Sequence, residues 1–391
     1  MAELRQNTWE TDTWYDQAVA GNVSFQWGGS LWAWGNNAQG VLGQNTSGGP
    51  TKVSSPVQIP TDRWKSISLA APGAAVVALK ANGTMWFWGR NEGGRSGLNY
   101  DKDYSSPIQI GTDSDWALLS HVGGQATMGA IKNDGTLWMW GAAGQGKLGT
   151  GDIINRSSPI QLPGEYDVIA CGKTNSCAIK RDGTLWSWGN AVYGGLGLND
   201  TVKRSSPTQV GTNTNWKHCA SGTYNQAAIT TSGQLFTWGQ GNNGMLGLNN
   251  NNQRSSPTSV PGTWAWASMS MTNAANMLGV KTNGSLYTWG SNTYGALGQN
   301  NLTQYSSPTA LSGTWSIEAD LNGQCPLSND TGGCAMKSDG TWWVWGMNTY
   351  GQLGINKTWA WNQATTPTQI PGSWDIIRMS NGGGQGIKPP A

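Results

Sequence analysis

The stretch KNDGTLWMWGAAGQGKLG, residues 132–149, places Trp138 and Trp140 two positions apart and follows them with a run of glycines. The pair Asp134-Gly135 favours the two-residue turn of a β-hairpin, because both central residues of that turn need positive φ. Side chains alternate along the strand that follows, so the two tryptophans lie on one face and the apolar residues between them on the other. The stretch therefore predicts a β-hairpin that is covered on both faces.

This pattern recurs seven times along the 391 residues. The glycine of the Trp-Gly pair is at positions 35, 89, 141, 189, 239, 290 and 346. Two positions before each tryptophan is an aromatic residue: Trp32, Trp86, Trp138, Trp186, Phe236, Tyr287 and Trp343. A G-x-x-G sequence follows each copy, and then Ser-Ser-Pro, or Thr-Thr-Pro in the last. Such regular repetition indicates a fold made of equivalent units.

Each unit contains four predicted strands. The hairpin supplies two of them, and the strand before it begins with an aromatic residue: Trp64, Trp116, Tyr166, Trp216, Trp264, Trp315 or Trp374. The fourth follows the Ser-Ser-Pro sequence, because proline is tolerated at the first residue of a strand. Four short strands in each of seven units predict an all-β fold, a seven-bladed β-propeller of four-stranded antiparallel blades. Large indole rings would fill the wedge between neighbouring sheets, and glycines would supply the sharp turns between blades.

One part of the repeat resembles a phosphate-binding loop. Gly141 through Lys147 has the spacing G-x-x-x-x-G-K, but a nucleotide site needs Ser or Thr next to hold magnesium, and Leu148 occupies that position. The equivalent sequences GNNAQGVLG and GSNTYGALG keep the glycines and lack the lysine. We therefore interpret the stretch as a turn between blades, with no cofactor.

The two ends of the chain complement each other. The C-terminal segment stops before a W-x-W strand, and the N-terminal segment reaches one without a preceding Ser-Ser-Pro, so one blade should combine N- and C-terminal strands. Residues 13 to 29 also contain a predicted strand pair, and only one pair fits the composite blade. The other pair would be an extra edge or an arm. We place an N-terminal arm at residues 1–13 and a single propeller domain at 14–391.

The composition excludes several classes of protein. Charged residues make up 11% of the chain, and 23 basic against 21 acidic residues give a net charge of +2. Binding to nucleic acid or to an anionic membrane needs a concentrated basic surface, so neither partner is expected. We found no secretory signal in MAELRQNTWETDTW and no apolar run of about 18 residues, so membrane insertion is not expected either.

The residue types used in catalysis and metal binding are scarce. His121 and His218 have no metal-ligand spacing to another histidine or to a cysteine, and His218 is expected to be structural or at the surface. None of the common catalytic motifs is present. We predict no enzyme and no metal site. The five cysteines favour reduced thiols, although Cys325 and Cys334 are spaced to close a loop.

The unit resembles the repeat of the regulator of chromosome condensation family, whose members are seven-bladed propellers with a W-G…G-x-L-G signature. The resemblance covers about residues 14 to 391. The founding member exchanges guanine nucleotide on a GTPase and binds nucleosomes through a basic tail, whereas the tail of this chain is neutral to acidic. Similar propellers occur in bacteriophage genomes as parts of the particle. The resemblance therefore implies the fold firmly and leaves several functions open.

Units that deviate from the repeat mark candidate partner-binding residues. The last unit carries a longer loop, INKTWAWNQATT, and the sixth has an insertion of about eight residues, NGQCPLSNDTGGC. Off-pattern aromatic residues on loops either anchor interfaces or fold back onto the surface. The predicted contact residues in these two loops are Trp359, Trp361, Asn356, Lys357, Asn329 and Asp330.

A lysine ends the strand before the hairpin in six units. These residues are Lys80, Lys132, Lys180, Lys281, Lys337 and Lys388. Propeller symmetry predicts that they form a basic ring on one face of the disc. The ring would either meet an acidic partner or be a solvated rim.

We expect a non-catalytic structural or protein-binding propeller. By analogy with the phage proteins, the expected place is the virion, as a capsid decoration or a tail- or fibre-associated protein that mediates assembly or surface attachment. The expected partners are other proteins, chiefly virion subunits in a homo-oligomeric or symmetric assembly, with a cell-surface glycan as a further candidate. The alternatives are a cytoplasmic protein-interaction propeller and a regulator that acts like a guanine-nucleotide exchange factor.

Overall fold

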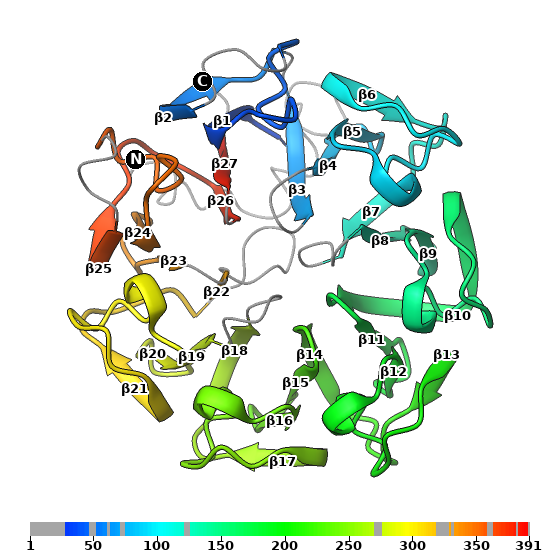
Figure 1. The fold of residues 1–391 in the computed structure, drawn as a ribbon, viewed down its shortest axis with the longest axis vertical. Coiled ribbons are helices and arrows are strands. Elements are labelled where there is room, and N and C mark those ends of the chain that lie inside the picture. Colours follow the sequence, from blue (N-terminus) through cyan, green and yellow to red (C-terminus); the bar gives the residue numbers. More distant parts are fainter. Residues whose placement is uncertain are drawn as a thin grey trace, which may run out of the picture.

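Seven blades surround a central axis in the computed structural model, which confirms the predicted architecture (Figure 1). The structure describes residues 28–46, 52–60, 63–70, 75–120, 126–269, 276–317, 328–329, 332–357, 363–380 and 382–389. Five sheets have four antiparallel strands each. The sixth has seven strands and supplies two blades, because β10 pairs with β9 through its first half and with β11 through its second.

We number the blades 1 to 7 in ring order. Blade 1 holds β26 (Ile376–Met379), β27 (Gly383–Lys388), β1 (Ser30–Asn36) and β2 (Lys52–Gln58); blade 2 holds β3 (Trp64–Ala70), β4 (Ala75–Lys80), β5 (Met85–Gly89) and β6 (Tyr104–Ile110); blade 3 holds β7 (Trp116–Leu119), β8 (Thr127–Lys132), β9 (Thr136–Gly141) and the first half of β10 (Arg156–Cys171). In Figure 1 the first strand of a blade, such as β3, lies nearest the axis and the fourth, such as β6, lies at the rim.

The remaining blades follow the same order. Blade 4 holds the second half of β10, then β11 (Asn175–Lys180), β12 (Leu185–Gly189) and β13 (Arg204–Gln209); blade 5 holds β14 (Trp216–Ser221), β15 (Asn225–Thr230), β16 (Leu235–Gly239) and β17 (Arg254–Val260). Blade 6 holds β18 (Trp264–Met269), β19 (Asn276–Lys281), β20 (Leu286–Gly290) and β21 (Tyr305–Leu311); blade 7 holds β22 (Ser328–Asn329), β23 (Gly332–Met336), β24 (Trp342–Met347) and β25 (Gln363–Gln369). Short 3-10 turns follow the third strand of blades 2 to 6: η2 (Glu92–Gly94), η3 (Gly144–Gly146), η4 (Val192–Gly194), η5 (Asn242–Gly244) and η6 (Thr293–Gly295).

Blade 1 closes the ring with strands from both ends of the chain. The C-terminal pair β26 and β27 forms its inner half, and β27 pairs with β1 from Ser30–Lys388 to Gly35–Gly383. The structure thus decides the question that the sequence left open, in favour of the C-terminal pair. The predicted N-terminal pair and the arm at residues 1–13 fall almost wholly outside the described residues; of them, Gly29 bridges to Trp64.

Seven clusters of buried apolar side chains hold the disc together, and each joins two neighbouring blades. Trp140 packs with residues of blade 2 such as Phe87, whereas Leu137 and Met139, on the other face of the same strand, pack with residues of blade 4 such as Ile169. The prediction that both faces of the hairpin are covered is therefore confirmed. Each sheet contributes to two cores.

The second tryptophan of each W-x-W strand makes the contact that repeats most strictly between blades. All seven of these indoles are fully buried: Trp34, Trp88, Trp140, Trp188, Trp238, Trp289 and Trp345. All of them except Trp238 donate their Nε1–H to a backbone carbonyl in the G-x-x-G turn of the preceding blade, at 2.8–3.0 Å. In ring order from Trp34, the accepting carbonyls belong to Gln352, Val41, Arg95, Lys147, Met245 and Ala296. The contact from Trp34 to Gln352 closes the circle.

The last glycine of each G-x-x-G turn makes room for that indole. Its φ lies between 64° and 75° in all seven copies. At Gly197 an added Cβ would lie 2.7 Å from Nε1 of Trp238, closer than real Cβ atoms approach. Glycine is thus needed here both for its backbone conformation and for the space that the next blade's tryptophan fills.

We predict that Gly197→Ala lowers the free energy of unfolding by about 3 kcal/mol, because it adds an overpacking clash to the cost of a left-handed alanine. Gly211→Ala is the matched control: φ is 63° there, and nothing lies within 4 Å of an added Cβ. The control should lose only about 1 kcal/mol. Chemical denaturation of both variants measures the difference, and equal losses would contradict the role assigned to the glycine.

Candidate functional site

The two faces of the disc carry different chemistry. The hairpin face holds the turns between the second and third strands of each blade, with the linkers that lead into the next blade. The loop face holds the connections from the third to the fourth strand, including the 3-10 turns η2 to η6 (Figure 1). All six predicted ring lysines lie on the hairpin face, at the ends of their strands.

Each of these lysine ammonium groups lies over two aromatic rings of its own blade: the aromatic residue that opens the first strand or precedes it in the chain, and the first ring of the W-x-W strand. The distances from Nζ to the two ring centroids are 5.1 and 4.2 Å for Lys80, 5.0 and 5.2 Å for Lys132, 5.6 and 3.8 Å for Lys180, 5.3 and 4.3 Å for Lys281, 5.6 and 3.6 Å for Lys337, and 4.8 and 4.1 Å for Lys388. A cation is attracted to the face of an aromatic ring at such distances. The lysines therefore already have partners within the fold, and binding of an acidic partner by this ring remains a prediction.

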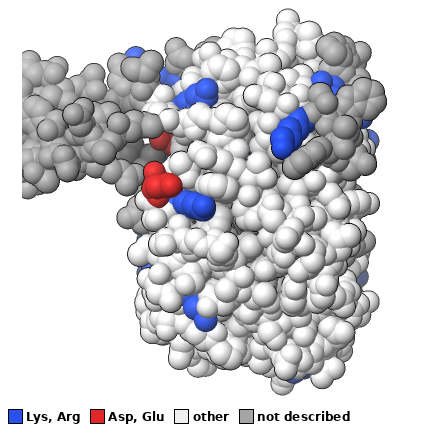
Figure 2. All heavy atoms as spheres, turned by 90° about the vertical axis from the view of Figure 1, so that its left-hand side faces the viewer, with Lys and Arg blue, Asp and Glu red and all other residues white. Residues whose placement is uncertain are grey.

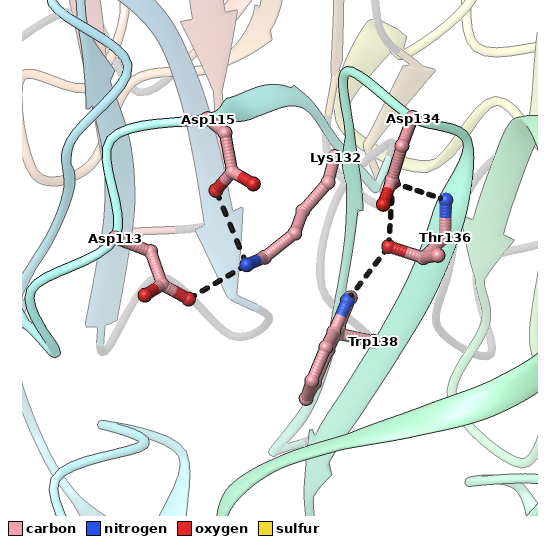
Figure 3. Close-up of polar contacts among 6 residues, drawn as sticks. All are labelled: Asp113, Asp115, Lys132, Asp134, Thr136 and Trp138. Atoms are coloured by element: carbon pink, nitrogen blue, oxygen red, sulfur yellow. Dashed lines mark hydrogen bonds and ion pairs between the residues drawn. The ribbon is translucent and has the colours of Figure 1, made fainter.

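Blade 3 adds carboxylates to this arrangement (Figure 3). Nζ of Lys132 lies 2.7 Å from Asp113 and 3.1 Å from Asp115, both in the linker that enters the blade. Burial alone would lower the pKa of Lys132, but hydrogen bonds and charge attraction from the two aspartates outweigh it and raise the pKa. The lysine thus ties the linker to the hairpin.

A second hydrogen-bond chain lies beside it in Figure 3. Trp138 donates from Nε1 to Oγ1 of Thr136 at 3.0 Å, and Thr136 donates to Asp134 at 2.7 Å. Equivalent chains join Trp86, Thr84 and Asn82; Trp186, Thr184 and Asp182; and Trp343, Thr341 and Asp339. Hydrogen bonds from the backbone N–H and the side chain of Thr136 lower the pKa of Asp134. The hairpin turn predicted at Asp134-Gly135 is confirmed.

Blade 5 departs from the pattern. Thr230 occupies the lysine position, and Asn213 and Asn215 occupy the positions of the two aspartates in the blade 3 linker. Trp216 and Phe236 keep the edge-to-face ring pair, with centroids 5.4 Å apart. Blades 6, 7 and 1 keep the lysine without a carboxylate at either linker position, so the pair of aspartates is a feature of blade 3, and blade 5 shows that the ring pair forms without the ammonium.

The predicted contact residues lie on or near the loop face where they are described. Asn356 and Lys357 are exposed, and Asn356 has a positive φ of 56°. Asn329 lies in the short strand β22, opposite Gly332. Trp359, Trp361 and Asp330 lie outside the described residues. Their role in binding a partner remains a prediction.

Two basic residues of the loop face are buried, which was not predicted from the sequence. Arg95 and Lys147 occupy the same position of the turn in blades 2 and 3, where the other units have Val41, Gly195, Met245, Ala296 and Gln352. Burial lowers the pKa of Lys147 to about 8, and the charges of Arg95 and Lys173 act in the same direction. Nζ of Lys147 donates to the carbonyl of Lys173 at 3.1 Å.

The backbone of the same turn is bonded to itself. Gly146 donates from its N–H to Ala143 and Gly149 donates to Gly146, so these amides are not gathered around a phosphate. This geometry agrees with the interpretation of the motif as an inter-blade turn.

The remaining candidate groups are buried. His218 accepts or donates a hydrogen bond between Nε2 and the carbonyl of Ala267 at 2.9 Å, and burial lowers its pKa. Cys171, Cys177 and Cys219 are unbridged buried thiols. Cys334 is also buried, and Cys325 lies outside the described residues, so the proposed bridge remains untested. Within the described ranges no group of three His, Cys, Asp or Glu side chains is placed to hold a metal ion. No helix in the described part of the chain is long and apolar enough to cross a membrane.

We predict that replacement of Lys337 by Met lowers the free energy of unfolding by about 1 kcal/mol, because two cation–π contacts are lost while the side chain keeps its length. Lys203→Met is the control, since Lys203 is exposed and lies over no described ring. Denaturation of the two variants under one set of conditions provides the comparison. A loss in the control as large as that in Lys337→Met would show that the aromatic rings are not the cause.

A second prediction concerns pH. The pKa of Lys147 is about 8 in the folded chain against an ordinary value of 10.5, so between these values the unfolded chain binds more protons and stability rises with pH. We expect Lys147→Met, which copies Met245 of blade 5, to remove a rise on the order of 3 kcal/mol. Thermal unfolding of both chains between pH 7 and pH 10.5 measures this rise. The free energy of unfolding of the wild type should increase relative to that of the variant as the pH increases. A constant difference would contradict the lowered pKa.

Comparisons with known proteins agree with this geometry. Residues 22–332 match the family model "RCC1-like domain", and residues 339–385 match the model "Regulator of chromosome condensation (RCC1) repeat". Among curated proteins, the chain is 31% identical over 161 residues to RCC1 domain-containing protein RUG3, mitochondrial, of Arabidopsis thaliana. It is 29% identical over 156 residues to the probable E3 ubiquitin-protein ligase HERC3 of Homo sapiens. These matches cover 38% of this chain in both cases, but only 35% and 14% of the two relatives.

Solved structures extend the likeness to the whole disc. Human WBSCR16 superposes with a TM-score of 0.77 at 19% identity, covering 92% of this chain and 100% of that one. Yeast RCC1 (Prp20), solved bound to Kap60, superposes with a TM-score of 0.76 at 18% identity, covering 93% and 90%. At these identities the superpositions show the fold alone. With the family model matched over most of its length, this chain belongs to the family of RCC1-like domains built from regulator of chromosome condensation repeats.

Proposed function

We propose that this chain is a non-catalytic protein-binding propeller whose partner docks on the loop face. The distribution of exposed apolar side chains carries the proposal. Ten large hydrophobic residues are exposed in the described part of the chain, and eight of them lie on the loop face: Tyr100, Ile153, Ile154, Val192, Tyr193, Val202, Tyr294 and Leu302. Exposed apolar side chains gathered on one face of a protein are candidates for contact with a partner.

The eight residues come from equivalent loops of different blades. Tyr100, Ile153, Val202 and Leu302 lie near the tips of the connections in blades 2, 3, 4 and 6, whereas the connection in blade 5 carries Asn251 and Asn252 there. On the hairpin face, by contrast, the ring lysines are held by the rings beneath them. Among the described residues, the exposed apolar side chains that a partner spanning several blades would meet lie on the loop face.

Binding of proteins by similar propellers supports the proposal. Yeast Prp20 was solved bound to Kap60, and a second structure of Prp20p from Saccharomyces cerevisiae was reported with its binding properties to Gsp1p and histones. None of these partners is carried over to this chain. The likeness supports only the general idea that this disc offers a face to another protein.

The virion is the proposed place of action, with virion subunits as the partners. The support is compositional: 11% charged residues and a surface rich in uncharged polar side chains. Figure 2 shows a flank of the disc on which charged groups are few and scattered. Quantitative mass spectrometry of purified particles tests this location, and absence of the chain from them would rule it out.

We predict that the triple variant Ile153→Asp, Val202→Asp, Leu302→Asp loses its partner while keeping the melting temperature of the wild type, because these side chains are exposed. The control triple variant, Thr212→Asp, Thr231→Asp, Thr282→Asp, places the same charges on exposed positions of the hairpin face. Affinity purification of tagged chains from the native source, with isotope-based quantification, compares the two. If the loop-face variant retains the partner and the control variant loses it, the partner docks on the hairpin face and the proposal is wrong.

A further inference from the structure

One position of the loop-face turn has an unusual backbone conformation. The residue before the first glycine of the G-x-x-G turn has positive φ in blades 2 to 6, with values of 72° at Gly93, 69° at Gln145, 61° at Tyr193, 58° at Asn243 and 61° at Tyr294. Glycine and asparagine adopt this left-handed region readily. Bulky residues are disfavoured there, because the Cβ atom crowds the following carbonyl.

The two tyrosine side chains make few contacts within the fold that could offset this backbone strain. Their side chains are 39% exposed at Tyr193 and 47% exposed at Tyr294. Tyr193 touches one ring, that of Tyr224 in blade 5, edge-to-face with centroids 5.6 Å apart. Tyr294 makes no hydrogen bond or ring contact with any described residue. Blades 2 and 5 form the same turn with Gly93 and Asn243, so the fold does not require an aromatic residue at this position.

Unpaired basic groups lie on the same side of the disc. Lys173, Lys203 and Arg254 belong to blades 4 and 5 on the loop face, and none of them makes an ion pair with a carboxylate in the described chain. Arg204 beside them is neutralised by Asp200 at 2.7 Å. The loop face of blades 4 to 6 therefore combines exposed aromatic rings with uncompensated positive charge.

We propose that Tyr193 and Tyr294 are the contact residues by which a protein partner with an acidic surface docks on the loop face of blades 4 to 6. Strained positions that the fold does not need are found at functional sites. Tyrosine is enriched among the residues that dominate binding energy, since it buries a large ring and keeps a polar tip. Carboxylates of the partner would pair with Lys173, Lys203 and Arg254, which adds rate and specificity to the encounter.

This inference rests on the proposed function and narrows it to one sector and one partner chemistry. It also predicts an unusual effect of mutation on stability. Replacing a contact residue in a left-handed conformation by glycine relieves strain, so binding should fall while stability stays the same or rises. A residue that merely supports the turn would behave in the opposite way.

The test uses the full-length double variant Tyr193→Gly, Tyr294→Gly, which copies Gly93 of blade 2. We expect a melting temperature equal to or above that of the wild type and a loss of partner of at least about tenfold in affinity purification from the native source. Gln145→Gly is the matched control, because it makes the same backbone change at an exposed residue of blade 3. It should leave the amount of partner unchanged.

The charge component is tested separately with Lys203→Glu, Arg254→Glu. This variant should retain less partner, with the difference shrinking as sodium chloride is raised. A photo-crosslinking phenylalanine derivative in place of Tyr294 then identifies the partner segment by mass spectrometry, and we expect that segment to be rich in Asp and Glu. A segment without acidic residues, or an adduct to a glycan instead of a polypeptide, would overturn the inference.

The outcomes separate this inference from the proposed function. If the triple loop-face variant releases the partner and the tyrosine variant does not, docking on the loop face stands and the role of the tyrosines is wrong. If the tyrosine variant has a lower melting temperature and also loses the partner, the tyrosine rings have a structural role and the inference is also wrong. If no protein is held through the loop face at all, both proposals fail.

Discussion

The contact between one indole and one glycine in the blade before it determines how this disc is built. The second tryptophan of every W-x-W strand fills the space that the last glycine of the preceding G-x-x-G turn leaves open, and six of the seven indoles also donate to a carbonyl of that turn. Burial of an indole removes roughly 200 Å² from water, on the order of 5 kcal/mol before the chain's entropy is counted. Because the contact passes from each blade to the next and returns from Trp34 to Gln352, it also fixes the closure of the ring.

The two tryptophans of the strand stabilise different parts of the structure. The first is half-buried and bonds within its own hairpin, through Thr136 to Asp134 in blade 3, beneath a lysine ammonium. The second is fully buried and bonds across the blade boundary, as Trp140 does to Arg95. One strand thus stabilises a local turn at one end and a long-range interface at the other. This division explains why the repeat keeps both aromatic positions while it varies the residues between them.

The sequence predicts what depends on local periodicity and on repetition. Seven units, four strands in each, the hairpin turns and a composite blade all follow from spacing. It does not predict which strand pair closes the ring, because both pairs carry the same local pattern and only the pairing of β27 with β1 distinguishes them. Nor does it reveal that Lys147 is buried, since that depends on a carbonyl of Lys173, which lies in the next blade. The positive φ of Tyr193 is hidden for a related reason, although the glycine and asparagine at its equivalents were a usable signal.

Because the chain contains seven copies of one unit, a residue that departs from the repeat can be compared with the residues at the same position in the other blades. Thr230 replaces a lysine in blade 5, and Trp216 and Phe236 keep their edge-to-face contact without the ammonium, so this change needs no explanation outside the fold. The exposed Tyr294 is different, because the same turn forms with Asn243 in blade 5 and no ring contact or hydrogen bond of the tyrosine side chain with a described residue offsets the strain of the backbone. Compensated deviations belong to the scaffold. Uncompensated ones gathered on one face are where a partner has most to contribute, and in this disc that face is the one with the exposed apolar loops.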